Sequence, residues 1–271
     1  MKTVGMIAGN GQFPIMAARE AVEQGYRVVA CAIEKEADPA IEKIAAACCW
    51  VKIGELKKLV QFFRSEKVNQ AIMAGKIEKV RLFQENVKPD LDMVKVLMKT
   101  RDYKDDSLLS AIADYLEEHD VKLLDSTVFL KHALPGAGVL GKRKPSKEIM
   151  EDIRFGFKIA KTIAGLDFGQ TVVVKKKAIM AVEAIEGTDS AIRRGGDLGG
   201  AKTTVVKVAK PRQDMRFDVP AVGLRTLDQM IEIQAQAFAF EAGKTIILEQ
   251  EDFVARANLK GIVVVGVNEN E

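Results

Sequence analysis

Apolar residues in the first half of the chain form short runs that alternate with longer segments of helical period. The runs predict strands at 2–8, 26–33, 49–53, 70–75 and 121–124. The periodic segments predict helices at 14–24, 55–65, 90–100 and 105–118. Strands that alternate with helices usually form a parallel, doubly wound sheet. We therefore expect an α/β fold whose N-terminal domain has a mostly parallel, Rossmann-like sheet.

The pattern changes at 132–147, where three glycines, two prolines and a basic run interrupt any apolar period. Such a composition is typical of a connecting segment. We therefore predict a flexible linker here and two domains, at 1–133 and 134–271. The second domain holds the densest groups of acids, bases and glycines, so we expect the catalytic groups there.

The second half of the chain has the pattern of a mixed α/β domain. Its apolar runs predict strands at 171–174, 178–185, 203–208, 244–248 and 261–267. Its helical segments are predicted at 147–164, 227–240 and 250–258, the first of them capped by Ser146.

Composition excludes several classes of protein. Lys and Arg total 41 against 38 for Asp and Glu, a net charge of +3, so we expect no nucleic-acid partner. No apolar run approaches the ~20 residues of a membrane-spanning helix, and the first residues lack the pattern of a signal peptide. We therefore expect a cytoplasmic protein. Three cysteines without metal-site spacing favour neither disulfides nor zinc.

The first predicted strand ends in a glycine loop, IAGNGQFP, directly before a helix. Helix N–H groups at this position in an α/β sheet attract anionic ligands. Pro14 stands where a dinucleotide fingerprint would have its third glycine, and Glu34 lies near the expected ribose-binding acid. An NAD(P)-dependent oxidoreductase and a tight turn without a ligand are therefore alternatives. The candidate ligand-binding residues of this loop are Gly9, Asn10, Gly11 and Gln12.

Two later segments, 181–200 and 207–223, combine acids, bases and glycines at high density. Carboxylate oxygens suit hard divalent cations, Arg and Lys offset phosphate charge, and glycine lets backbone N–H groups approach phosphate oxygens. This mixture favours phosphate chemistry over a solvated loop. The candidates are Glu186, Thr188, Asp189, Arg193, Arg194, Gly195, Gly196, Lys207, Lys210, Gln213, Asp214, Arg216 and Asp218.

These two segments and IAGNGQFP together resemble the LpxI family, the UDP-2,3-diacylglucosamine pyrophosphatases of lipid A biosynthesis, over the whole chain. The resemblance implies two domains that enclose the lipid product. It also implies Mg²⁺-dependent hydrolysis of UDP-2,3-diacylglucosamine to UMP and 2,3-diacylglucosamine 1-phosphate (lipid X). The family's essential aspartate corresponds to Asp214 or Asp218, of which we favour Asp214.

From this resemblance we expect Asp214, Asp218 and Arg216 to be catalytic. Asp214, Asp218 and Asp189 are the candidate ligands of Mg²⁺ or Mn²⁺, because the chain offers no histidine or cysteine cluster. The other candidates are expected to bind substrate. A non-catalytic nucleotide-sugar binding protein is a further alternative. A homodimer and peripheral association with the inner membrane are both compatible with this interpretation.

Overall fold

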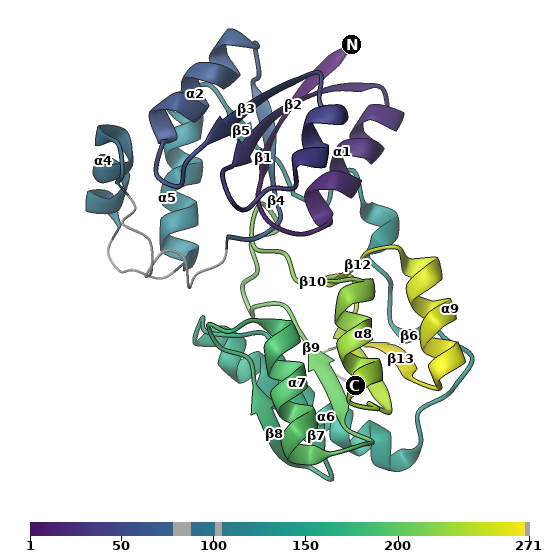
Figure 1. Ribbon diagram of the computed structural model, residues 1–271. Helices are drawn as coiled ribbons and strands as arrows, with labels where there is room; N and C mark the ends of the chain where they lie inside the picture. The colour runs from purple at the N-terminus through teal and green to yellow at the C-terminus, as the bar shows by residue number, and fades with distance from the viewer. Residues whose placement is uncertain (78–87, 101–104, 269–271) are drawn as a thin grey trace. The chain divides into compact units, whose positions relative to one another are not determined.

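A computed structural model describes residues 1–77, 88–100 and 105–268 (Figure 1). Contacts within the chain divide it into two compact units. Unit 1 comprises Met1–Lys131 together with Asp214–Asp218, and unit 2 comprises His132–Gln213 and Val219–Glu271. The chain therefore passes between the units three times. The predicted division at 133/134 did not include the return of residues 214–218 to unit 1.

Unit 1 is built on a five-stranded, entirely parallel sheet in the order β3-β2-β1-β4-β5. Its strands are β1 (Lys2–Ala8), β2 (Tyr26–Ile33), β3 (Ala47–Val51), β4 (Gln70–Ala74) and β5 (Lys122–Leu123). The prediction of a doubly wound parallel sheet is confirmed. The order reverses between β1 and β4, and in such sheets ligands bind beside this reversal, at the carboxyl ends of the strands.

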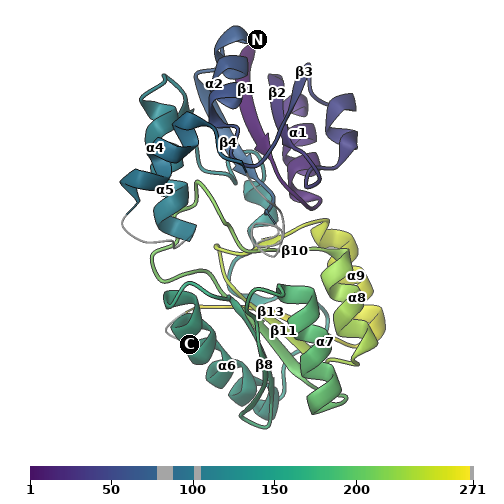
Figure 2. The same cartoon turned by 60° about the vertical axis from the view of Figure 1, so that its left-hand side comes forward.

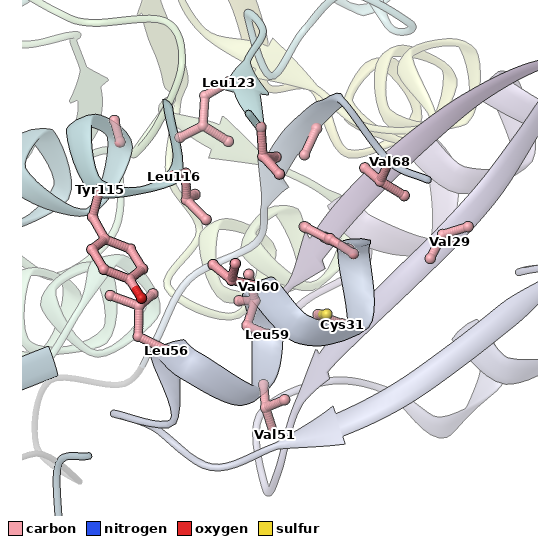
Figure 3. Close-up of a cluster of buried hydrophobic side chains, with 14 of the residues drawn as sticks. Val29, Cys31, Val51, Leu56, Leu59, Val60, Val68, Tyr115, Leu116 and Leu123 are labelled. Carbon is pink, nitrogen blue, oxygen red and sulfur yellow. The ribbon is translucent and has the colours of Figure 1, made fainter. Parts of the chain in front are cut away.

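Helices cover both faces of this sheet (Figures 1 and 2). They are α1 (Phe13–Glu23), α2 (Leu56–Ser65), α4 (Leu91–Lys99) and α5 (Asp105–Glu117), with short 3₁₀ turns at Pro39–Lys43 and Lys131–Ala133. Helices α2 and α5 pack on one face, where Leu59 and Leu116 meet strand residues such as Val29 and Cys31 (Figure 3). Helix α1 buries an alanine-rich stripe on the other face.

Unit 2 has a mixed six-stranded sheet in the order β6-β13-β11-β9-β7-β8. Its strands are β6 (Gly138–Val139), β7 (Thr171–Lys175), β8 (Ala178–Val182), β9 (Thr204–Lys207), β11 (Ala237–Glu241) and β13 (Val263–Val267). β9, β11 and β13 are parallel to one another, whereas β6 and β7 are antiparallel to their neighbours. A second, two-stranded sheet joins β10 (Ala221–Val222) to β12 (Ile246–Ile247). The predicted mixed α/β architecture is confirmed.

The six-stranded sheet has a separate hydrophobic core on each face. Helix α6 (Lys147–Gly165) contributes to the core on one face, and α7 (Thr188–Gly199), α8 (Leu224–Glu232) and α9 (Gln250–Lys260) contribute to the other. Residues of β11 alternate between the two cores: Ala237 and Ala239 face α6, whereas Phe238 and Phe240 face the opposite helices. This strand is therefore buried on both sides.

Two sequence-based predictions in unit 2 were wrong, and one helix was not predicted. The expected helix at 227–240 ends at Glu232, and its second half forms strand β11. The segment around 188–199 is a helix that the glycine-rich pattern did not predict. Part of the expected flexible linker, Gly138–Val139, pairs with β13 as a sheet strand.

Candidate active site

The glycine loop of unit 1 lies at the reversal of strand order and pairs with the loop after β4. The Asn10 N–H donates to the Lys76 carbonyl at 2.7 Å, and the Lys76 N–H donates to the Asn10 carbonyl at 3.1 Å. A Cβ at Gly9 would lie 2.6 Å from the Lys76 carbonyl oxygen, so glycine is required for this approach. The backbone N–H and carbonyl of Asn10 are thus both used in hydrogen bonds within unit 1. Gly11 is exposed, has φ +102°, and a Cβ placed on it would meet no atom within 4 Å.

Residues Asp214–Asp218, which we call the acid segment, are held in unit 1 by three contacts. The backbone N–H of Ser126 donates to the Met215 carbonyl at 2.8 Å. The Ser126 hydroxyl donates to the Arg216 carbonyl at 2.6 Å. Phe217, only 2% exposed, belongs to the hydrophobic core that α2 and α5 form with the parallel sheet. The position of the acid segment is therefore set by unit 1.

Arg216 forms a two-pronged pair with Asp214 inside this segment. Its Nε lies 3.1 Å from both carboxylate oxygens, and its Nη2 lies 2.7 Å from Oδ2. Hydrogen bonds from the Arg216 side chain lower the pKa of Asp214 despite its partial burial, so the carboxylate is ionised at neutral pH. The bond to Asp214, followed by the charges of Asp114 and Glu117 on α5, raises the pKa of Arg216. Asp218 is exposed and has φ +53°.

A second group of charges, which we call the buried charge cluster, lies in unit 2. It consists of Thr171, Glu183, Thr188 and Lys207. Lys207 Nζ donates to the hydroxyls of Thr188 at 2.9 Å and Thr171 at 3.2 Å, and lies 3.8 Å from Glu183 Oε2. The Thr188 hydroxyl donates to Glu183 Oε1 at 2.8 Å. The cluster thus joins the carboxyl ends of β8 and β9 to the first turn of α7.

Burial alone would raise the pKa of Glu183. The charge of Lys207 and hydrogen bonds from Thr171, Thr188 and the backbone of Gln170 outweigh burial, and the pKa is lowered. Glu183 is therefore an ionised carboxylate inside the protein, matched by one ammonium group. Such a pair is tolerated because its remaining hydrogen-bonding positions are filled.

Further ion pairs lie at the same edge of the unit 2 sheet. Lys161 Nζ donates to both carboxylate oxygens of Glu241 and to the Ala209 carbonyl, each at 3.1 Å. Lys210 Nζ lies 2.5 Å from Asp167 Oδ1. Lys161, Lys207 and Lys210 are all buried next to a carboxylate. The carboxyl ends of β9 and β11 therefore carry basic groups whose charge is locally balanced.

The glycines of the segment 181–200 have a packing role in the structure. Gly195 and Gly196 lie inside helix α7, where a Cβ on either would clash with Val173 or Ile233. Their N–H groups lie beyond the first turn of the helix, so the expectation that they approach phosphate is not supported. They let α7 pack closely against β7 and the end of α8.

The polar candidates of this segment have different surroundings. Arg194 is exposed and donates to Glu186 Oε1 at 2.5 Å and to the Val182 carbonyl at 2.8 Å. Arg193 is exposed and makes no ion pair with the described residues. Asp189 Oδ1 accepts a hydrogen bond from Thr226 at 2.8 Å. Arg193 is thus the more available of the two arginines.

The expected metal ligands are divided between the units, with Asp214 and Asp218 in unit 1 and Asp189 in unit 2. Among the described residues, no three His, Cys, Asp or Glu side chains gather as a metal site. Mg²⁺ needs only one or two carboxylates beside phosphate oxygens and water. Asp214 and Asp218 offer two carboxylates on one segment of unit 1, which is the donor chemistry that Mg²⁺ prefers.

Sequence reasoning missed two residues that organise these sites. Glu183 was visible as an acid inside the strand predicted at 178–185, although its neighbours were selected instead. Nothing in the sequence around Ser126 indicates its role, because the residue that its hydroxyl bonds, Arg216, lies 90 positions further along the chain. Within the described parts of the chain, no helix is long and apolar enough to cross a membrane.

Comparisons with known proteins identify the family. Residues 3–133 match the family model described as LpxI N-terminal domain, and residues 136–265 match LpxI C-terminal domain. The UDP-2,3-diacylglucosamine pyrophosphatase LpxI of Caulobacter vibrioides is 30% identical over 282 aligned residues, which cover 100% of this chain and 99% of that protein. The predicted resemblance, and with it the prediction of an enzyme, is confirmed.

Solved structures give a much weaker likeness. A biotin carboxylase from Campylobacter jejuni matches with a TM-score of 0.29 and 12% identity, over 73% of this chain and 42% of that one. An N5-carboxyaminoimidazole synthetase from Staphylococcus aureus matches with a TM-score of 0.26 and 18% identity, over 73% and 44%. The chain spans less than half the length of these proteins, and neither match supports an argument about fold or function. On the full-length sequence matches, the chain belongs to the LpxI family.

Proposed function

We propose that the chain hydrolyses the pyrophosphate bond of UDP-2,3-diacylglucosamine, releasing UMP and lipid X, with Mg²⁺ or Mn²⁺ bound. The name of the full-length relative supplies the substrate. One observation carries the proposal: Asp214 is an ionised carboxylate on the acid segment, and Ser126 holds that segment in unit 1. The two acyl chains make the proposed substrate a membrane lipid, so we also propose that the protein acts at a membrane surface from the cytoplasm.

The lowered pKa of Asp214 bears on its role. A carboxylate that binds protons weakly is a poor general base at neutral pH. It is a good acceptor for a cation or for an O–H group of an attacking water. We therefore assign Asp214 to orienting the reacting groups, with Asp218 as the second oxygen donor. A divalent cation held by these two residues would offset charge on the pyrophosphate.

Arg216 keeps the Asp214 carboxylate in position until other groups bind. Its bonds to both carboxylate oxygens at 2.7–3.1 Å define the orientation of that side chain. About a third of each side chain is exposed, so the pair is accessible to substrate. Since Arg216 is cationic, it also disfavours protonation of Asp214 and is suited to an anionic ligand.

We assign substrate binding to polar residues at the carboxyl ends of the unit 2 strands and to the glycine loop. Lys207 is the last residue of β9, and Lys210 lies three residues beyond it. Thr188 is the first residue of α7, and the N–H groups at the start of a helix attract anions. Because Lys207 and Lys210 are already paired with carboxylates, a phosphate oxygen would replace one of the present partners of these ammonium groups.

The test is incubation of the purified protein with UDP-2,3-diacylglucosamine and Mg²⁺, with UMP measured by chromatography. We expect UMP to appear with Mg²⁺, to disappear with chelator, and to return when Mg²⁺ is restored. A non-catalytic sensor would bind the substrate without releasing UMP, and an oxidoreductase would bind a nicotinamide dinucleotide instead. UMP release that is undiminished after exhaustive chelation and dialysis would contradict the role given to the cation.

A further inference from the structure

Helix α4 of unit 1 carries apolar side chains on two opposite sides. On one side, Val96 is buried in the core that α2 and α5 form with the parallel sheet, and Met93 packs against that core. On the other side, Leu91, Val94 and Met98 are 79%, 37% and 82% exposed. Their spacing places them in one line along the helix, which we call the α4 stripe. A surface helix usually has polar residues on its outer side, so the stripe marks an interaction surface.

The acids at the start of α4 fix the orientation of the helix. Asp90 caps it: one carboxylate oxygen accepts from the Met93 N–H and the other from the Lys57 N–H of α2, both at 2.8 Å. The Asp92 carboxylate accepts a hydrogen bond from the Tyr115 hydroxyl of α5, the helix that lies beside α4 in Figures 1 and 2. Turning the α4 stripe inward would break these bonds, so its exposure is a property of the fold.

The other exposed residues of α4 are two lysines, Lys95 and Lys99. Lys95 Nζ lies 2.8 Å from Asp92 and Lys99 Nζ lies 3.1 Å from Glu118, yet the two lysine side chains are 69% and 64% exposed. Ion pairs this open to water contribute little, so both ammonium groups can bind another anion. Asp92 is the one acid within the helix, and its side chain is only 20% exposed. The outer side of α4 thus presents large apolar and cationic side chains together.

This combination fits an anionic lipid surface. Helices that lie in the plane of a membrane interface have an apolar stripe flanked by Lys or Arg. The apolar side chains enter the boundary of the acyl region, and the lysines are attracted by the negative surface potential. A second copy of the chain fits less well. A twofold contact through this face would bring the lysines of both copies together, and like charges disfavour such a contact.

We propose that α4 docks unit 1 on a bilayer that contains anionic phospholipids. The α4 stripe enters the interface, and Lys95 and Lys99 bind the phosphates of the head groups. The inference rests on the proposed function for the reason that the protein meets a membrane, since the proposed substrate is a membrane lipid. A short helix with few apolar side chains gives reversible binding, and the charge attraction makes that binding sensitive to salt.

The first experiment measures sedimentation of the full-length protein with vesicles of phosphatidylcholine alone or mixed with phosphatidylglycerol. We expect binding to the mixed vesicles, weaker binding to phosphatidylcholine, and a decrease as salt is added. The double variant Leu91→Ser, Met98→Ser should lower the partition coefficient by about tenfold or more, because two exposed side chains no longer enter the interface. Leu259→Ser, which replaces another leucine that is 86% exposed but lies on α9, should leave binding unchanged. Equal binding by the wild type and the double variant would overturn the proposal.

Removal of charge tests the two lysines. The double variant Lys95→Gln, Lys99→Gln should lower binding to the mixed vesicles by about tenfold at low salt, and the difference should shrink at high salt. Lys147→Gln, which removes an exposed lysine of α6, is the matched control and should bind as the wild type does. A double variant that binds the mixed vesicles as well as the control does would exclude head-group binding by these lysines.

Two further measurements distinguish docking from its alternatives. Sedimentation velocity without vesicles tests for a second copy: a wild-type dimer that Leu91→Ser, Met98→Ser converts to a monomer would overturn the membrane assignment. UMP release separates docking from the proposed function. The same variant should match the wild type with UDP-2,3-diacylglucosamine in detergent, but should be about tenfold slower when the lipid is embedded in mixed vesicles. UMP release without vesicle binding by the wild type would overturn docking alone, whereas vesicle binding without UMP release in either form would overturn the function alone.

Discussion

The acid segment of unit 1 and the buried charge cluster of unit 2 both contain a carboxylate with a lowered pKa next to a cation. They differ in exposure. The side chains of Asp214 and Arg216 are 35% and 37% exposed, whereas those of Glu183 and Lys207 are 13% and 6% exposed. An accessible pair contributes little to stability and can exchange partners, but a buried pair cannot lose one member without stranding the other.

The same chemistry therefore serves different purposes in the two units. In unit 1 the pair sits on a segment fixed by Ser126 and Phe217, so the carboxylate can change partners without loss of its position. In unit 2 the pair holds β8, β9 and α7 together. The comparison predicts that mutations in the acid segment mainly affect catalysis, whereas removing one charge of the Glu183–Lys207 pair mainly destabilises the fold.

The largest effect is expected from Glu183→Ala. The variant leaves the ammonium of Lys207 buried without a counter-ion, and breaking such a pair typically destabilises a protein by about 3–5 kcal/mol. Urea unfolding followed by circular dichroism measures the change. The double variant Glu183→Leu, Lys207→Met should regain most of the lost stability, because it removes both charges. A double variant as unstable as Glu183→Ala would show that the pair itself is not the cause.

The opposite result is expected from Asp214→Ala. This substitution should lower kcat/KM for UMP release on the order of 100-fold or more, as removal of one group that stabilises a transition state does. The free energy of unfolding should change by less than about 1 kcal/mol, because the lost ion pair is accessible to water. Asp120→Asn, an exposed acid of the same unit, is the matched control. A rate within threefold of the wild type would remove Asp214 from the catalytic site.

The fold that places these two ion pairs could be predicted only in part from the sequence. Parallel strands with intervening helices were predicted because each element in unit 1 has a clear period and a boundary residue. Strand β11 was mistaken for the end of a helix, since Ala237–Glu241 is buried on both faces and shows no alternation of polar and apolar residues. Alanine and glutamine before it also favour helix.

Helix α7 was missed for the opposite reason. Glycine disfavours helix by ~1 kcal/mol per residue in isolation. Packing overrides that preference here, since only glycine fits at 195 and 196 against Val173 and Ile233. The return of the acid segment to unit 1 was equally invisible, because a domain prediction assumes continuous stretches of chain. The Ser126–Arg216 bond exists only in three dimensions.

Lowering the pH should weaken the buried charge cluster by protonating Glu183, with a smaller effect than the substitution Glu183→Ala. The pKa of Glu183 is lower in the folded chain than its ordinary value of 4.5, so its contribution to stability is present above pH 4.5 and is lost as pH falls through the folded pKa. One such group changes stability by at most about 1.4 kcal/mol per pH unit. Unfolding free energies of the wild type and Glu183→Gln, measured between pH 6 and 3, should therefore depend on pH with different slopes. Parallel slopes would mean that Glu183 does not titrate with folding.

Ser126→Ala tests how firmly unit 1 holds the acid segment. Removing the hydroxyl leaves the Arg216 carbonyl without that hydrogen bond, which is worth about 1 kcal/mol. We expect a loss of that size in unfolding free energy, and a several-fold fall in kcat with KM little changed. Ser126→Thr keeps a hydroxyl and should restore kcat. A loss of stability with wild-type kcat in Ser126→Ala would make the contact purely structural.

The smallest effect is expected from Arg194→Ala, which tests whether exposure, and not the choice of unit, decides what an ion pair contributes. Arg194 and Glu186 belong to unit 2, yet their side chains are 47% and 30% exposed. Water screens such a pair, so its loss should change the free energy of unfolding by less than about 1 kcal/mol. Urea unfolding at low and high salt measures this small difference, which should shrink further as salt is added. A loss comparable to that of Glu183→Ala would mean that the bond from Arg194 to the Val182 carbonyl secures the end of β8, and that position in unit 2 outweighs exposure.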